Sequence, residues 1–336
     1  MSYTNGLDDP SAYFQIKLYT GDGNTPRAHT FDSDTDMQPD LIWLKKRNTD
    51  GFHVLTDSVR GAGKQITANN GDGESTNSNG GYVSAFGTDG FTTTNGSVND
   101  FYVNTSGSIY IAWSWKKSAT SGFDIVTYTG NGSDRDISHS AGAAPHWMMV
   151  KNRTGSDRAW NCYHDGLGAD KRLFINTTDS VSTASTAFTD EPTSSVMKLG
   201  TNVEVNENTV TYLSYIWAPI QGFSKFGKYV GNGDADGPMV FTGMRSAFII
   251  IKNADDNGNN WFGFSYNTAG FNGETNHMVM NEDEADVTNN LIDLYSNGFK
   301  SRESSGATNT SGSNYVYCAW AEQPFVNSNG VPCTAR

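Results

Sequence analysis

The sequence predicts an all-β protein made of three tandem antiparallel β-sandwich repeats, jelly-roll or lectin-like in type, of about 100 residues each and closely packed. The first observation is a pattern that occurs three times. Each copy has a strand-like segment with a Gly-x-Gly turn, an apolar run ending in lysine, and a Tyr followed five residues later by Trp. These markers lie at 14–23, 39–47 and 110–115, then at 123–132, 145–153 and 212–217, and finally at 224–233, 246–254 and 315–320. A period near 100 residues exceeds the roughly 20–50 of solenoids, so each copy is large enough for a small domain.

The second observation is composition. Charged residues make up only 18% of the chain, which contains 36 glycines, so Ser, Thr, Asn and Gly must supply the polar surface. This composition is typical of all-β proteins with short strands and many turns.

The repeats divide the chain into five segments in order. A polar arm covers 1–12, the three repeats cover 13–117, 122–220 and 222–323, and a tail covers 324–336. Because the linkers between repeats are so short, we expect the three domains to touch.

Within a repeat, the marker segments read as strands because β-branched and aromatic residues dominate them and Gly, Asn and Asp bound them. Asp-Gly and Asn-Gly pairs such as Asp22-Gly23 and Asn131-Gly132 favour tight turns. The nearly continuous apolar runs indicate strands covered on both faces. One segment, 276–296, has an acidic first half that suits a helix N-terminus, and there we expect a helix.

The charge balance is acidic, with a net charge of −13. Nucleic acids and anionic membrane surfaces are bound by clustered Lys and Arg, so we expect neither as a partner. No apolar run approaches the roughly 20 residues that span a bilayer, so we expect no membrane insertion. Residues 1–14 lack both a basic and an apolar segment, so we expect no signal peptide and synthesis in a cytoplasm.

We expect no enzyme activity and assign no catalytic residues, because no familiar catalytic motif occurs in the sequence. The segment Cys162-Tyr163-His164-Asp165 superficially resembles a nucleophile and its base, but it reads as a strand. The three cysteines have no metal-type spacing, and their odd number argues against a disulfide framework.

Three acidic loops have a calcium interpretation: one with Asp32, Asp34 and Asp36, one with Asn70, Asp72 and Glu74, and one with Asp255 and Asn257. The loop at Asp32 lacks the following glycine, and the loop at Asp255 lacks a closing glutamate. A solvated turn rich in Asx residues is the competing interpretation. We expect no other cofactor.

Aromatic side chains shortly after the lysine strand repeat as Phe52, Trp160 and Trp261. They are candidates for stacking on a glycan, while a repeated core residue is the competing interpretation. Lys45, Lys151 and Lys252 also repeat, and we interpret them as strand-end lysines that reach solvent or guard a sheet edge. The segments between the shared markers differ among the copies, for example 61–88, 176–196 and 265–290.

Several motifs together resemble a known family. They are YTGNG (128–132), PHWMMVKNR (145–153), LGADKRLFINTT (167–178), GFSKFGKYVGNG (222–233), IDLYSNGFKSR (292–302) and AEQPFVNSNGVPCTAR (321–336). The set is similar to virion structural proteins of tailed phages of marine hosts, especially cyanophages, which are usually called tail fibres. The resemblance implies a β-sandwich virion protein, lectin-like in outline, and supplies no catalytic residues.

On this resemblance we expect a protein of the virion, either a tail fibre or a tail-associated receptor-binding protein that mediates adhesion to the host. Its partners would be other virion proteins and a host surface glycan or protein. An alternative is a capsid or tail decoration protein that stabilises the particle, and a further one is a glycan depolymerase. Phage fibres are habitually homotrimers, so a homotrimer is expected; a monomer with internal pseudo-threefold symmetry is the other possibility.

Overall fold

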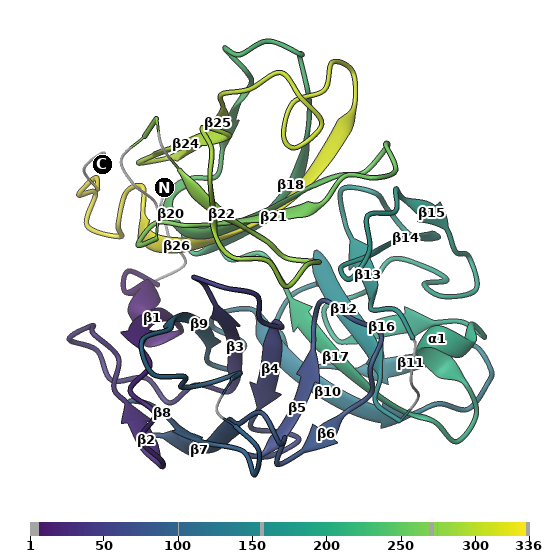
Figure 1. The fold of residues 1–336 in the computed structure, drawn as a ribbon. Coiled ribbons are helices and arrows are strands. Elements are labelled where there is room, and N and C mark those ends of the chain that lie inside the picture. Colours follow the sequence, from purple (N-terminus) through teal and green to yellow (C-terminus); the bar gives the residue numbers. More distant parts are fainter. Residues whose placement is uncertain (1–6, 100, 155–157, 269–271, 274, 334–336) are drawn as a thin grey trace.

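The computed structural model describes residues 7–99, 101–154, 158–268, 272–273 and 275–333. They form three β-sandwich units of roughly 100 residues, one for each sequence repeat, which confirms the predicted fold class. Figure 1 shows the three units as lobes around a common centre, with unit 1 in purple and blue, unit 2 in teal and unit 3 in green and yellow. Residues 1–6 of the predicted arm and 334–336 of the predicted tail lie outside the described residues.

Each unit contains one six-stranded antiparallel sheet with the same strand order. The first strand of the unit pairs with the last, the last pairs with the third, and the fourth, fifth and sixth follow. In unit 1 the order is β1 (Phe14–Thr20), β9 (Ile109–Trp115), β3 (Leu41–Lys46), β4 (Val54–Asp57), β5 (Lys64–Thr67) and β6 (Ser75–Thr76). In unit 2 it is β10 (Phe123–Thr129), β17 (Thr211–Trp217), β12 (Trp147–Asn152), β13 (Asn161–His164), β14 (Lys171–Phe174) and β15 (Ser182–Thr183). In unit 3 it is β18 (Ser224–Val230), β26 (Asn314–Pro324), β20 (Met244–Asn253), β21 (Trp261–Ser265), β22 (Asn276–Val279) and β23 (Val287–Thr288).

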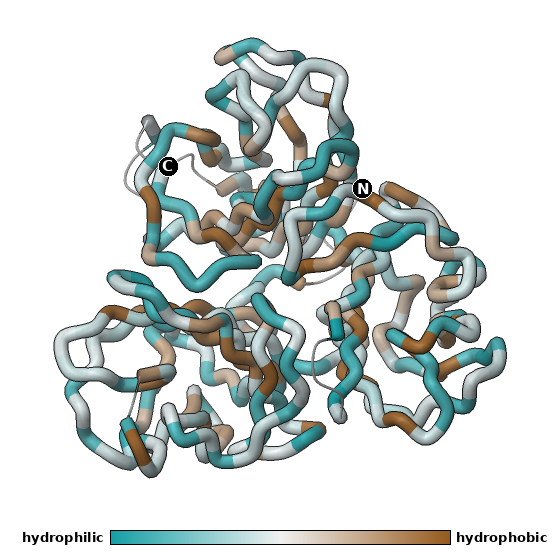
Figure 2. Tube along the Cα trace, turned by 45° about the vertical axis from the view of Figure 1, so that its right-hand side comes forward, coloured by the Kyte–Doolittle hydropathy of each residue, from teal (hydrophilic) through white to brown (hydrophobic). Residues whose placement is uncertain are grey.

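A smaller sheet forms the second layer of each sandwich. In unit 1 it contains β2 (Arg27–His29), β8 (Gly90–Thr94) and β7 (Tyr82–Gly87); in unit 2, β11 (Arg135–Ser138) and β16 (Val196–Leu199); in unit 3, β19 (Met239–Phe241), β25 (Gly298–Ser301) and β24 (Ile292–Tyr295). One large apolar core runs through all three units and includes Trp43, Trp147 and Phe248, so the units are packed on each other rather than strung along the chain. In Figure 2 hydrophilic segments recur on the outer loops of each lobe.

The helix expected over 276–296 is wrong, because this segment forms β22, β23 and β24. Its acidic part forms instead a loop whose main-chain carbonyls, at Asp283 and Glu284, accept hydrogen bonds from Lys45 of unit 1. Helices in the described part of the chain are limited to the 3₁₀ turn η1 (Pro10–Ala12) and α1 (Val203–Asn206). None of them has the length and apolar character that crossing a membrane requires.

The repeated Gly-x-Gly turn has a steric explanation in the second unit. A Cβ on Gly130 would lie 2.1 Å from the carbonyl oxygen of Glu207, which only a glycine avoids. Gly132 has a φ of 71°, in the left-handed region that favours glycine. The side-chain amide of buried Asn206 donates to the oxygens of Asn131 and Ser133 and holds the turn in place. The equivalent glycine pairs are Gly21 with Gly23 and Gly231 with Gly233, and the equivalent amides are Asn104 and Asn309.

The tyrosines of the markers also have one shared task. In unit 2 the rings of Tyr128 and Tyr212 stack with centroids 5.2 Å apart. The hydroxyl of Tyr128 donates to the carbonyl of Val205, and the hydroxyl of Tyr212 donates to that of Val203. The pairs Tyr19 with Tyr110 and Tyr229 with Tyr315 repeat this arrangement. The tyrosines therefore fasten the segment before the last strand to the sheet.

Candidate functional site

The three tryptophans that end the repeated pattern meet at the centre of the molecule. The ring centroids of Trp115, Trp217 and Trp320 lie 5.3–5.9 Å apart in every pair, and each pair is edge to face. All three side chains are buried, and their indole N–H groups have no hydrogen-bond acceptor among the described residues. Edge-to-face packing brings the positive edge of one ring to the negative face of another, which suits this arrangement. The repeated tryptophan is thus the centre of a pseudo-threefold scaffold.

The three repeated lysines lie at the contacts between neighbouring units, here called seams, and link the two units of each seam. Each is fully buried, and its ammonium donates to main-chain carbonyls of the unit before it in a closed cycle. The bonds run from Lys45 to Asp283 and Glu284 of unit 3, from Lys151 to Gly71 of unit 1, and from Lys252 to Thr178 of unit 2. The interpretation of these lysines as solvent-reaching or edge-guarding is therefore wrong. Burial lowers the pKa of Lys45 and Lys252 to about 8.

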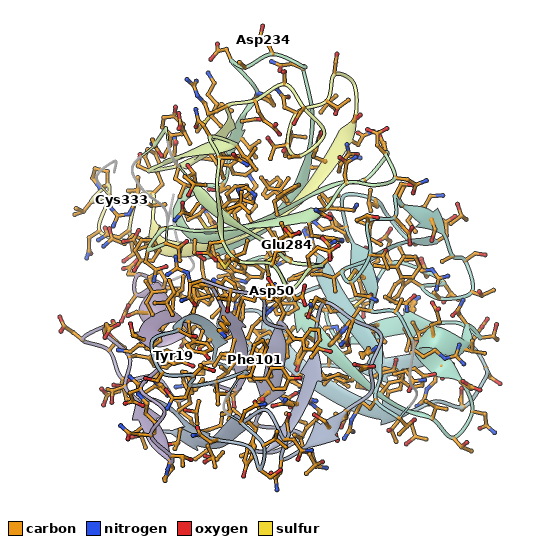
Figure 3. All side chains as sticks on the ribbon, in the orientation of Figure 1. Tyr19, Asp50, Phe101, Asp234, Glu284 and Cys333 are labelled. Carbon is orange, nitrogen blue, oxygen red and sulfur yellow. The ribbon has the colours of Figure 1, made fainter. Side chains whose placement is uncertain are left out.

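Main-chain hydrogen bonds follow the same cycle. The main-chain N–H of Asp286 donates to the carbonyl of Arg47, that of Glu74 to the carbonyl of Arg153, and that of Val181 to the carbonyl of Ala254, each over 2.7–2.8 Å. In Figure 3 Glu284 lies beside Asp50 where units 3 and 1 meet. Parts of the variable segments 61–88, 176–196 and 265–290 thus face a neighbouring unit of the same chain.

Of the glycan-stacking candidates, Trp160 and Trp261 are fully buried, so neither ring can stack on a sugar. The indole N–H of Trp160 donates to the carbonyl of Thr67, 2.8 Å away in unit 1. Trp261 does the same to Phe174 of unit 2. These two tryptophans are seam residues, as the core interpretation required.

The third candidate, Phe52, is not their equivalent. In unit 3, Trp261 pairs with Lys252 across the ladder. In unit 1, Leu44 pairs with Val54, so the next pair along the ladder places His53 opposite Lys45. His53 Nε2 accordingly contacts the carbonyl of Val279 in unit 3 at 3.2 Å, completing the cycle. Phe52 is half-buried and packs on Tyr102.

The seam between units 1 and 2 holds a buried charge cluster. Arg60 donates to Asp57 at 2.5 Å, to Glu74 at 3.3 Å and to the hydroxyl of Tyr215 at 3.1 Å. Arg153 adds a second cation against Glu74, at 3.0 Å. Each charge has a partner, so the cluster is a structural network and its groups are not available for acid–base chemistry.

The candidate calcium ligands have protein partners or face solvent. One carboxylate oxygen of Asp255 accepts two hydrogen bonds from Asn314, and the side-chain oxygen of Asn257 accepts one from the N–H of Ser180. Asp32, Asp34 and Asp36 are exposed, and Asp32 forms an ion pair with Lys17. Within the described ranges, no group of three or more His, Cys, Asp or Glu side chains is arranged to hold a metal ion.

The Cys162 and His164 pair lies on strand β13 and does not assemble into a nucleophile and base. Burial raises the pKa of the Cys162 thiol to about 12. Both ring nitrogens of His164 are occupied, Nε2 by the carbonyl of Tyr317 and Nδ1 by the N–H of Gly166. Asp165 turns away and faces His146.

The described part of the chain has surface clefts, two of which have volumes of about 500 Å³. One, of about 520 Å³, lies where units 3 and 1 meet, beside the chain segment that begins at Asp8, and is lined by carboxylates that already have partners, such as Asp9 with Thr35. The other, of about 500 Å³, lies in unit 3 between the segment from Gln221 to Lys225, Phe241 and Phe325. Neither cleft was predicted from the sequence, because both form between segments far apart in the chain.

A family model described as "Domain of unknown function (DUF7483)" matches residues 9–324 of the chain. Among curated proteins, none matches this sequence.

Proposed function

We propose that this chain, which belongs to the DUF7483 family, is a structural protein of a tailed-phage particle that mediates adhesion, either as a tail fibre or as a tail-associated receptor-binding protein. The assignment to a phage rests on the resemblance of the motifs given above. The observation that carries the adhesive and structural role is the use of the repeated residues. The tryptophans and lysines join the three units, the Gly-x-Gly turns shape each unit, and none of these residues forms a reactive site.

A rigid body of this kind suits adhesion, because a binding surface that is already ordered loses little conformational entropy on contact. The variable surface then lies on the outer loops and on the small sheets, which are not part of the seams. The internal pseudo-threefold symmetry also supports a monomer that imitates a trimer, in place of the homotrimer expected from phage fibres.

Two measurements test the proposal. Electron microscopy with a specific antibody should place the protein on the tail of the intact particle, and the fluorescently labelled protein should stain host cells and compete with phage adsorption. Many copies on the head, together with no staining, would contradict adhesion and support the decoration role. Release of reducing ends from host polysaccharide would instead support a depolymerase.

A further inference from the structure

Unit 3 departs from the other two units on the first strand of its small sheet. The buried residue of that strand is His29 in unit 1, Ile137 in unit 2 and Val240 in unit 3, each opposite a buried apolar partner. The positions on either side of it point outwards. They are occupied by Ala28 and Thr30 in unit 1, by Asp136 and Ser138 in unit 2, and by Met239 and Phe241 in unit 3.

Only unit 3 therefore places large apolar side chains at these outward positions. Met239 is 45% exposed and Phe241 is 55% exposed. Among the described residues, Phe241 is the one aromatic residue that is exposed; the others are buried or half-buried. Since units 1 and 2 fold with small or polar residues here, the scaffold does not require the phenylalanine.

Phe241 forms one wall of the 500 Å³ cleft, a volume within the roughly 300–1,000 Å³ range of ligand pockets. Phe325 supplies a second wall, with its ring at 87° to that of Phe241 and the centroids 6.4 Å apart. Main-chain hydrogen bonds fix Phe325 in place, since its N–H donates to the carbonyl of Gly243 and its carbonyl accepts from the N–H of Cys333. The cleft thus has two apolar walls held at a right angle.

Lys225 places hydrogen-bond donors at this cleft. Its ammonium donates to the carbonyl of Phe241 at 2.7 Å, lies 5.4 Å from the centroid of the Phe241 ring, and donates to no other hydrogen-bond acceptor among the described residues. Two of its N–H groups are thus available to a ligand. The equivalent residues in units 1 and 2 are Gln15 and Asp124. Gln15 donates to the carbonyl of Thr35, and Asp124 accepts from the N–H of Ser140, so each holds the loop that follows the first strand of the small sheet.

We propose that the cleft between Phe241 and Phe325 binds a pyranose ring of a surface polysaccharide, with an apolar face of the sugar on Phe241 and a sugar oxygen accepting from Lys225. This inference rests on the proposed adhesive function. A pyranose has apolar C–H faces and an equatorial rim of hydroxyls, and the cleft offers an exposed aromatic ring beside unsatisfied N–H donors. A highly anionic polymer fits less well, because the chain carries a net charge of −13.

The test uses the full chain on an immobilised panel of neutral and uronate-containing oligosaccharides and bacterial surface polysaccharides. We expect at least one member of the panel to bind. F241A should weaken that binding about tenfold and K225M about fivefold. The matched control is S138A, which shortens the side chain at the equivalent position of unit 2 and should bind as the unmodified protein does. Unchanged melting temperatures establish that the variants fold, and F241A keeps the carbonyl to which Lys225 donates.

The outcomes separate this proposal from the adhesive function. If F241A stains host cells as strongly as the unmodified protein does, sugar binding in the cleft is refuted, whereas the adhesive function is not. A protein that stains no host cell and binds no member of the panel would overturn both. Sedimentation that shows a dimer for the unmodified protein and a monomer for F241A would assign the cleft to contact between copies, and so also overturn sugar binding.

Discussion

Acidification should weaken the fold through His164, whose environment permits only the neutral imidazole. Its Nε2–H donates to the carbonyl of Tyr317 in unit 3, and its Nδ1 accepts from the N–H of Gly166, both over 3.1 Å. A second proton on Nδ1 would face that N–H donor inside a buried site. Burial lowers the pKa of His164 to about 4, from 6.5 in an unfolded chain.

The magnitude follows from linkage between protonation and folding. Between pH 6.5 and about 4 the unfolded chain binds a proton at this position that the folded chain does not. The free energy of unfolding therefore falls as the pH falls through this window, and the contribution of this group levels off below it. At 1.36 kcal/mol per pH unit, the loss is about 3 kcal/mol.

Urea unfolding followed by tryptophan fluorescence at pH 7.5, 5.5 and 4.0 measures this effect. H164Q cannot titrate, so its free energy of unfolding should decline less than that of the unmodified protein, by about 3 kcal/mol over this range. H146Q is the control, because His146 lies in the same unit with its side chain 31% exposed. If H164Q and the unmodified protein lose stability in parallel, the argument from the neutral ring is refuted.

Five further substitutions, in three sets, test the scaffold by thermal and urea unfolding. R60L removes the cation paired with the buried Asp57 carboxylate, which keeps hydrogen bonds from Tyr215 and from the main-chain N–H at position 60, and should lower the free energy of unfolding by about 3–5 kcal/mol. K198L, at an exposed ion pair, should change the melting temperature little. G132A places a side chain at a positive φ without a steric clash, so the free energy of unfolding should fall by about 1–2 kcal/mol. G130A should lower it more, because its Cβ clashes with a main-chain carbonyl. The reverse order would contradict this account of the turn. W217A should cost about 3–5 kcal/mol, and a loss below 1 kcal/mol would show that the central cluster does not hold the units together.

The sequence was sufficient to predict local features that depend on residues near one another. The Gly-x-Gly turns and the strands before Trp115 and Trp217 have signatures of period, branching and turn chemistry, and the structure contains both. The same local reasoning failed at 276–296. There an acidic cluster suggested a helix N-terminus, but the carbonyls at Asp283 and Glu284 are held by a lysine from the other end of the chain.

Seam residues could not be assigned from the sequence for a related reason. Lys45 and Asp283 are 238 positions apart, and nothing in the spacing of the lysines shows that each reaches a neighbouring unit. The equivalence of Phe52 with Trp160 was an error of one residue in register. Position along the chain suggested it, whereas the ladder pairing assigns His53 to that place. A one-residue change in register moves a side chain to the other face of a strand, so this small error separates a seam residue from a half-buried one.

The threefold repetition supplies a comparison inside one chain that separates structural residues from residues free for other purposes. Where the three copies agree, as at Lys45, Lys151 and Lys252, each residue has the same seam contact, and folding explains its presence. Where they differ at an outward position, folding tolerates the alternatives. Phe241 stands where the other units carry Thr30 and Ser138. Its ring contacts Phe325 and Lys225, yet 55% of the residue stays exposed. Together with Met239 it forms an exposed apolar patch at the cleft, and the proposed contact with a sugar would bury part of this patch.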